Sequence, residues 1–111
     1  VMQRHPNHPA ANHLYIHVME ASPWPEIAEP AADRLINLIP AAGHLVHMPS
    51  HIWMQTGRYD DSANCNRKAA ALDDAWFEDN PNATVYSRFF TIYVFPNYTL
   101  PIAIQFMLDF I

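Results

Sequence analysis

The sequence predicts an all-α fold, and three observations lead to that expectation. The chain has 111 residues, which is the size of one small domain, and half of them are apolar, which is enough to bury a core. Only two residues are glycine, so few positions can adopt the positive φ that tight β-hairpin turns need. A histidine pattern recurs after 34 residues, and a period of this length is typical of stacked helical hairpins.

Charge and cysteine content exclude several classes of protein. The formal net charge is −5 and the pI is about 5.7, so no basic patch is expected to bind nucleic acid. Cys65 is the only cysteine, which excludes a disulfide framework. The first residues lack the apolar core of a secretory signal, and a cytoplasmic location is therefore favoured. What remains is an acidic domain with seven histidines against six Lys and Arg residues.

Two helices are predicted in the first half of the chain. The first spans residues 9–21, because Pro9 suits a first helical turn and the sequence Ser-Pro-Trp-Pro that follows stops the helix. The second spans residues 26–39, where apolar side chains recur at helical spacing until Pro40. Both helices fall within one unit of the 34-residue period.

Two more helices are predicted in the second unit. One covers residues 43–56 and ends at Gly57, and the other covers residues 60–77 or more. Pro49 conflicts with the first of them, because a proline in a helix interior costs about 3 kcal/mol and leaves one carbonyl without its donor. We therefore expect either a kink at Pro49 or a helix that begins only there.

The internal repeat resembles the tetratricopeptide repeat (TPR) family. The pattern His-x-x-x-His at 13–17 recurs at 47–51, and the second unit continues with Gly-Arg-Tyr-Asp-Asp-Ser-Ala at 57–63. The resemblance covers about residues 9–76. Histidine takes the place of the Trp, Leu and Gly that are usual in the first helix of each unit, so the chain is similar to a divergent, His-rich bacterial branch of the family.

This resemblance implies an α-α superhelix of two helical hairpins within a single domain. Repeat 1 would cover residues 9–42, repeat 2 residues 43–76, and residues 77–111 would form a C-terminal packing segment. Such folds are binding scaffolds first, and the concave face would receive a peptide or protein partner. The residues expected to contact that partner are Tyr15, Trp53 and Met54.

The repeated histidines predict a metal site. Histidines four residues apart lie on one helix face with Cβ atoms about 5–6 Å apart, which suits chelation of an ion. Equivalent helices of neighbouring repeats pack side by side, so the two pairs should face each other. Imidazole ligands favour Zn²⁺, Cu²⁺ or Ni²⁺. The candidate ligands are His13, His17, His44, His47, His51 and Glu20.

Two other functions stay open. The histidines and aromatic residues could line a metal-free groove that binds peptides. Alternatively, Glu20 beside a bound metal could act as the general base of a hydrolase. The zinc-protease string His-Glu-x-x-His is absent, and on balance we do not expect an enzyme. Trp24, Trp53 and Trp76 are expected in the core or the groove wall, and Cys65 is expected to be a small buried residue.

The C-terminal segment is aromatic and almost uncharged. Two repeats are too few to cover their own apolar faces, so we expect a homo-oligomer, a dimer, that packs through residues 86–111. The alternatives are a segment that folds back on the preceding helix, or a strand within the β-forming stretch 84–94. A membrane span at 89–108 has sufficient length, but its prolines and polar residues disfavour it.

Overall fold

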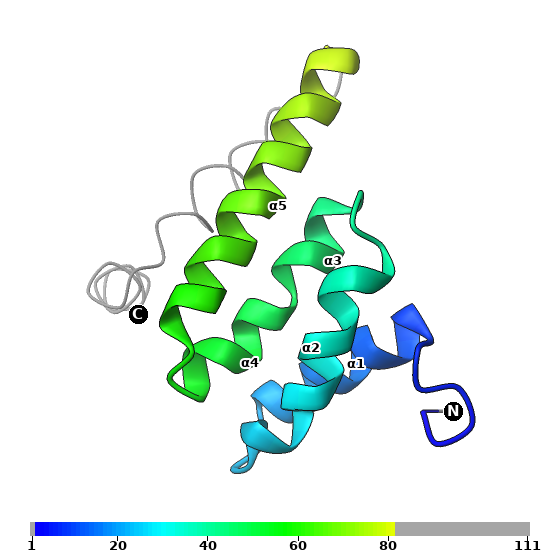
Figure 1. Ribbon diagram of the computed structural model, residues 1–111, viewed down its shortest axis with the longest axis vertical. Coiled ribbons are helices and arrows are strands. Elements are labelled where there is room, and N and C mark those ends of the chain that lie inside the picture. Colours follow the sequence, from blue (N-terminus) through cyan, green and yellow to red (C-terminus); the bar gives the residue numbers. More distant parts are fainter. Residues whose placement is uncertain (1, 82–111) are drawn as a thin grey trace.

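A computed structural model describes residues 2–81 of the chain. Within that range every regular element is a helix (Figure 1), which confirms the all-α class for the described part of the chain. The predicted oligomerisation segment, with its strand and membrane-span alternatives, lies outside the described residues from residue 82 onward. The elements are α1 (Pro9–Glu20), the 3₁₀ helix η1 (Pro25–Ala28), α2 (Glu29–Leu38), α3 (Gly43–His47), α4 (Pro49–Gln55) and α5 (Tyr59–Asp79).

Helices α1 and α2 occupy the ranges that the sequence predicts. The His8 side chain caps α1 by accepting a hydrogen bond from the Ala11 backbone N–H at 3.3 Å, and Pro9 follows as the first helical residue. The predicted helix 26–39 begins as the 3₁₀ turn η1 and continues as α2. Pro30 accounts for this difference, because it has no N–H to donate to the Glu26 carbonyl, which instead accepts from Glu29.

Pro49 divides the predicted helix 43–56 into α3 and α4. Met48, between them, keeps right-handed helical dihedral angles, and its N–H donates to the His44 carbonyl at 3.1 Å. The N–H of His51 then donates to the Met48 carbonyl only three residues back, at 3.2 Å. The chain thus runs through Pro49 as one interrupted helix and does not begin a helix only there, so of the two predicted alternatives the structure agrees with the kink.

The core lies where these helices meet. Helix α1 packs against α2 and α4, while α3 and α4 pack against α5. None of the helices within residues 2–81 combines the length and apolar character needed to cross a bilayer. The cluster of buried apolar side chains consists of Ile16, Ala28, Ala32, Leu35, Met48, Ile52, Trp53 and Cys65.

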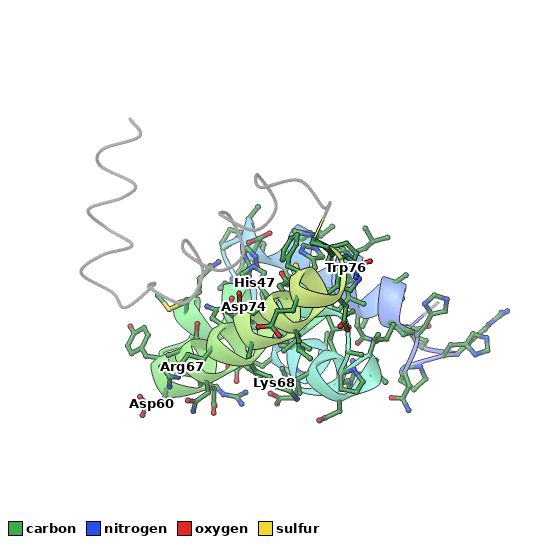
Figure 2. All side chains as sticks on the ribbon, turned by 90° about the horizontal axis from the view of Figure 1, so that it is seen from above. His47, Asp60, Arg67, Lys68, Asp74 and Trp76 are labelled. Atoms are coloured by element: carbon green, nitrogen blue, oxygen red, sulfur yellow. The ribbon has the colours of Figure 1, made fainter. Side chains whose placement is uncertain are left out.

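The predicted burial of Cys65 and of Trp53 is confirmed. Trp24 is 60% exposed and Trp76 is 55% exposed, so neither lies in the core, and the groove wall is the predicted environment that stays open for both. Trp24 lies in the proline-flanked loop before η1, and Trp76 lies on the surface of α5 (Figure 2), where its ring contacts Phe77.

Arg58, which precedes the first residue of α5, forms ion pairs with α2 and a cation–π contact with α4. Its guanidinium lies 2.7 Å from the Asp33 carboxylate and 3.3 Å from that of Glu29, both on α2. It also pairs with Asp61 at 2.9 Å and stacks over the Trp53 ring at 4.7 Å from the centroid. These contacts fix the orientation of the kinked helix α3–α4, which carries half of the candidate site.

Candidate metal centre

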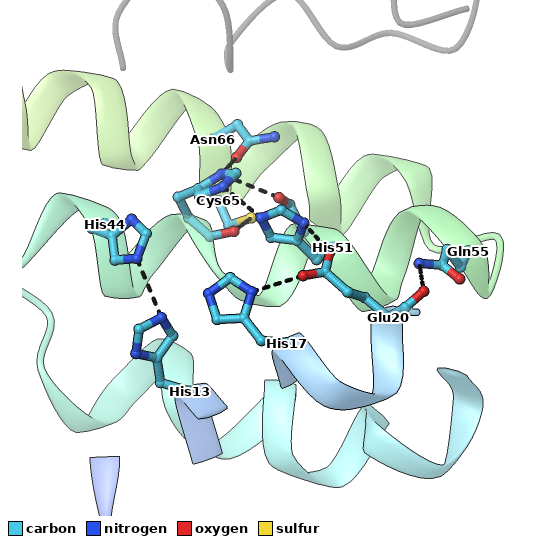
Figure 3. A network of polar contacts seen from close by, with 10 residues as sticks. His13, His17, Glu20, His44, His51, Gln55, Cys65 and Asn66 are labelled. Carbon is cyan, nitrogen blue, oxygen red and sulfur yellow. Dashed lines mark hydrogen bonds and ion pairs between the residues drawn. The ribbon is translucent and has the colours of Figure 1, made fainter. Parts of the chain in front are cut away.

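Six polar side chains from α1, α3 and α4 converge at one place, as Figure 3 shows for most of them. Helix α1 contributes two histidines and a glutamate, α3 two histidines, and α4 one histidine. The structure therefore brings together all six residues that the sequence predicts as ligands: His13, His17, Glu20, His44, His47 and His51.

The five imidazole rings form a closed circuit. Ring centroids are 4.8 Å apart for His13 and His17, and 5.1 Å apart for His13 and His44. Those of His47 and His51 are 4.7 Å apart. Two longer steps close the circuit, 5.9 Å from His17 to His51 and 6.2 Å from His44 to His47. The two repeated pairs thus face each other across α1 and the kinked helix, as predicted.

Ring nitrogens approach one another closely at two points of this circuit. The Nε2 atoms of His13 and His44 are 3.3 Å apart, and those of His47 and His51 are 2.9 Å apart. In addition, one ring nitrogen from each of His13, His17 and His44 lies within 4.8 Å of the other two. These separations are short enough for the histidines to share an ion.

Oxygen acceptors lie within hydrogen-bond distance of the Nδ1 atoms of three histidines. The two carboxylate oxygens of Glu20 lie 2.7 Å from Nδ1 of His17 and 2.6 Å from Nδ1 of His51. The amide oxygen of Asn66 lies 2.7 Å from Nδ1 of His47. Because these oxygens only accept, each Nδ1 carries the hydrogen, and in a neutral ring Nε2 then keeps its lone pair.

Buried polar contacts hold α1 in place, and this helix carries His13, His17 and Glu20 of the cluster. Asn12 is fully buried, and its amide nitrogen donates to the carbonyls of Pro6 at 2.7 Å and His8 at 2.9 Å. Its amide oxygen accepts from Arg34 on α2 at 3.2 Å. At the other end of α1, Gln55 donates to the Glu20 carbonyl at 2.9 Å. Both ends of α1 are therefore attached to neighbouring elements.

Burial lowers the pKa of four of these imidazoles and so favours their neutral form. It lowers the pKa of His47 to about 3, although the hydrogen bond with Asn66 opposes the shift. The pKa values of His13, His44 and His51 are also lowered, first by burial and then by repulsion from neighbouring imidazoles. For His51 the Glu20 carboxylate acts in the opposite direction. Neutral imidazole is the form that binds metal ions.

The predicted partner-contact residues have three different environments. Tyr15 is half-buried and lines an open surface groove with Leu14 and Val18. Trp53 is only 5% exposed and donates its indole N–H to Asp33, so a partner would touch little of it. Met54 is half-buried on α4. Their part in partner binding stays a prediction.

Asn66 is not among the residues predicted from the sequence, although the 34-residue repeat contains a signal for it. The 34-residue offset aligns Asn66 with Ala32, and both positions are buried, at 2% and 0% exposure. A polar residue where the equivalent unit has a core alanine indicates a buried polar partner. Ser50 was missed as well, and its hydroxyl lies 3.2 Å from Nδ1 of His47.

Comparisons with protein-family models, with curated proteins and with solved structures find no match to this chain. The function is therefore inferred from the geometry of the histidine cluster.

Proposed function

We propose that this chain is a TPR-like interaction scaffold whose histidine cluster binds a divalent transition metal. The observation that carries the proposal is the closed circuit of five imidazoles, three of which have Nδ1 held by an oxygen acceptor. A metal-bound histidine commonly donates its second ring N–H to a carboxylate or amide oxygen, which fixes the tautomer and the ring orientation. Three histidines of the cluster have such an oxygen acceptor at Nδ1.

The contact between His47 and His51 supports a cation at this site. Asn66 and Glu20 are acceptors, so both histidines carry hydrogen on Nδ1. When both rings are neutral, two Nε2 lone pairs face each other at 2.9 Å, which is repulsive. A proton or a metal ion between the two nitrogens removes the repulsion. Five imidazoles that each lie beside two others favour the metal, because each additional proton would repel its neighbours.

Nitrogen separations within the cluster also agree with coordination. Two nitrogens bound to one tetrahedral zinc at about 2.0–2.1 Å lie about 3.3 Å apart, and two bound at right angles lie about 2.9 Å apart. The Nε2 separation of His13 and His44 is 3.3 Å, and that of His47 and His51 is 2.9 Å. Imidazole-rich sites suit Zn²⁺, Cu²⁺ and Ni²⁺, and these are the ions we propose.

In this proposal Glu20 acts through the histidines. Both of its carboxylate oxygens already accept hydrogen bonds from imidazole nitrogens. This engagement favours the role of an outer partner that orients His17 and His51. A hydrolase that uses Glu20 as general base would have to break one of these contacts first.

The TPR-like arrangement is supported by equivalent positions in the two units. The histidine pairs lie on α1 and on the kinked helix α3–α4, and α2 and α5 follow them at corresponding places in the chain. Ala32 and Asn66, related by the same offset, are both buried. The kink at Pro49 is the main departure of the second unit from the first.

The proposal is tested with protein that carries no histidine tag. The purified chain is stripped with chelator, incubated with Zn²⁺, Cu²⁺ or Ni²⁺, desalted and submitted to elemental analysis and thermal unfolding. We expect retained metal and a rise in Tm, because an ion that binds only the folded state stabilises it. His44→Ala should weaken both effects, whereas His5→Gln, at an exposed histidine outside the cluster, should leave them unchanged. No retained metal and no rise in Tm with any of the three ions would refute the proposal.

A metal-free peptide-binding module is the second candidate. It is favoured by the apolar surface of α1, where Leu14 is 62% and Val18 is 67% exposed beside Tyr15. Such a module would hold its partner equally well with and without chelator, whereas a metal-dependent scaffold would release it.

A further inference from the structure

We propose that the cluster holds two metal ions in adjacent subsites. A triad subsite consists of His13, His17 and His44, and a pair subsite consists of His47 and His51. This inference rests on the proposed metal-binding function and adds the number of ions, their ligands and their relative lability.

The distances divide the five rings into these two groups. Within the triad, neighbouring centroids are 4.8 and 5.1 Å apart, and within the pair they are 4.7 Å apart. The two steps between the groups are longer, at 5.9 and 6.2 Å. The close Nε2 contacts obey the same division, since one joins His13 to His44 and the other joins His47 to His51.

The number of ligands also exceeds what one tetrahedral ion takes. Such an ion has four ligands, whereas the cluster supplies five imidazoles. Three histidines with a fourth position open for water is a known arrangement for a single zinc, and the triad provides it. The remaining pair would then bind a second ion with further positions filled by solvent or by an exogenous ligand.

Glu20 lies between the two subsites. One carboxylate oxygen contacts His17 of the triad, and the other contacts His51 of the pair. A single carboxylate thus orients one ligand in each subsite, and it also supplies negative charge that offsets the repulsion between two cations. Occupation of one subsite is thereby coupled to the other.

The two subsites differ in their access to solvent. His17 and His44 of the triad are exposed, and His13 is half-buried. His47 of the pair is only 3% exposed, and its partner His51 is half-buried. The triad ion should therefore exchange quickly, whereas the pair ion should exchange slowly. A chelator should remove the two ions in two kinetic phases.

The experiment measures stoichiometry and release in the same samples. Metal-free, untagged protein is titrated with Zn²⁺ by calorimetry, and bound zinc is confirmed by elemental analysis. Release into a chromogenic chelator is then followed over time. We expect two equivalents in the wild-type chain, one released quickly and one slowly. Loading with Cu²⁺ should also give an electron paramagnetic resonance signal broadened by the coupling of two nearby ions.

Three variants assign the phases to the subsites. His44→Ala should retain one equivalent and lose the fast phase, whereas His51→Gln should retain one equivalent and lose the slow phase. His5→Gln, as the matched control, should retain both. Circular dichroism of each variant before titration establishes that the helices are intact. His44 and His51 are chosen because neither side chain is fully buried, unlike His47.

The outcomes separate this inference from the proposed function. One equivalent in the wild-type chain, removed entirely by either His44→Ala or His51→Gln, would mean a single shared ion; the inference would fail and metal binding would stand. No bound metal would overturn both. Two equivalents that either substitution reduces to one would support the two-subsite arrangement.

Discussion

Acid should destabilise the metal-free protein, and His47 permits the size of the effect to be worked out. Burial lowers its pKa from 6.5 in the unfolded chain to about 3 in the folded one. Between these two values the unfolded chain binds more protons than the folded chain, so stability falls as the pH falls. The destabilisation is absent well above pH 6.5, and it grows as the pH falls from there toward pH 3.

The expected magnitude follows from the linkage relation. From pH 7.5 to pH 5.0, protonation of His47 in the unfolded state alone should lower the free energy of unfolding by about 2 kcal/mol. His13, His44 and His51 shift in the same direction and add to the loss. The lowered pKa of His47 already includes the repulsion from neighbouring His51, His44 and His17.

The assay is urea unfolding of chelator-treated protein at several pH values between 7.5 and 5.0. His47→Gln should reduce the dependence on pH, and His5→Gln should leave it as in the wild type. An unfolding free energy that changes by less than about 0.5 kcal/mol over this range would refute the reasoning. That result would mean that the cluster accepts protons in the folded state, as an open and hydrated site would.

Two other predictions concern packing and assembly. Gly43→Ala should destabilise the fold by about 1–3 kcal/mol, because the added Cβ would lie 2.0 Å from the Asp73 carboxylate and 3.1 Å from the Ala69 carbonyl. Removing the Asp73 side chain in the same variant should restore part of the loss in urea unfolding, and an unchanged Gly43→Ala variant would contradict the predicted close approach of α3 and α5. Light scattering at micromolar concentration should give about twice the mass of one 12.7 kDa chain, whereas a monomer would exclude the predicted dimer.

Local signals were sufficient to predict most of the helix boundaries within residues 2–81. Prolines and the glycine after the third predicted helix determine where helices begin and end, so the ranges 9–21 and 43–56 agree with the structure to within a residue or two. The effect of Pro49 was also predictable, because a missing N–H has the same local consequence in any helix. Trp24 and Trp76 were not predictable in this way, since burial depends on which elements cover a side chain.

The same distinction applies to the candidate site. Helical spacing places His13 beside His17 and His47 beside His51. The packing of α1 against α4 then brings His17 beside His51. Helical spacing also predicts the contact between His17 and Glu20, three residues apart. The contact between Glu20 and His51 joins two units, and no spacing rule indicates that one carboxylate would orient both rings. Tertiary packing alone establishes that contact.

The two units contribute unequally to the cluster, although their histidine patterns are the same. The offset of 34 residues aligns Glu20 with Met54, so the second unit has no carboxylate of its own at this position. His51 therefore uses the Glu20 carboxylate of the first unit.

The first unit, in turn, lacks an equivalent of the Asn66 side-chain amide. Asn66 of α5 holds His47, while Ala32 at the equivalent place in α2 has no side-chain acceptor to offer His13. His13 instead contacts His44 of the second unit through Nε2. Each unit thus lacks one polar partner, and the contacts of His51 with Glu20 and of His13 with His44 form only where the two units pack together. Metal binding by such a cluster would stabilise the packing of α1 against the kinked helix α3–α4.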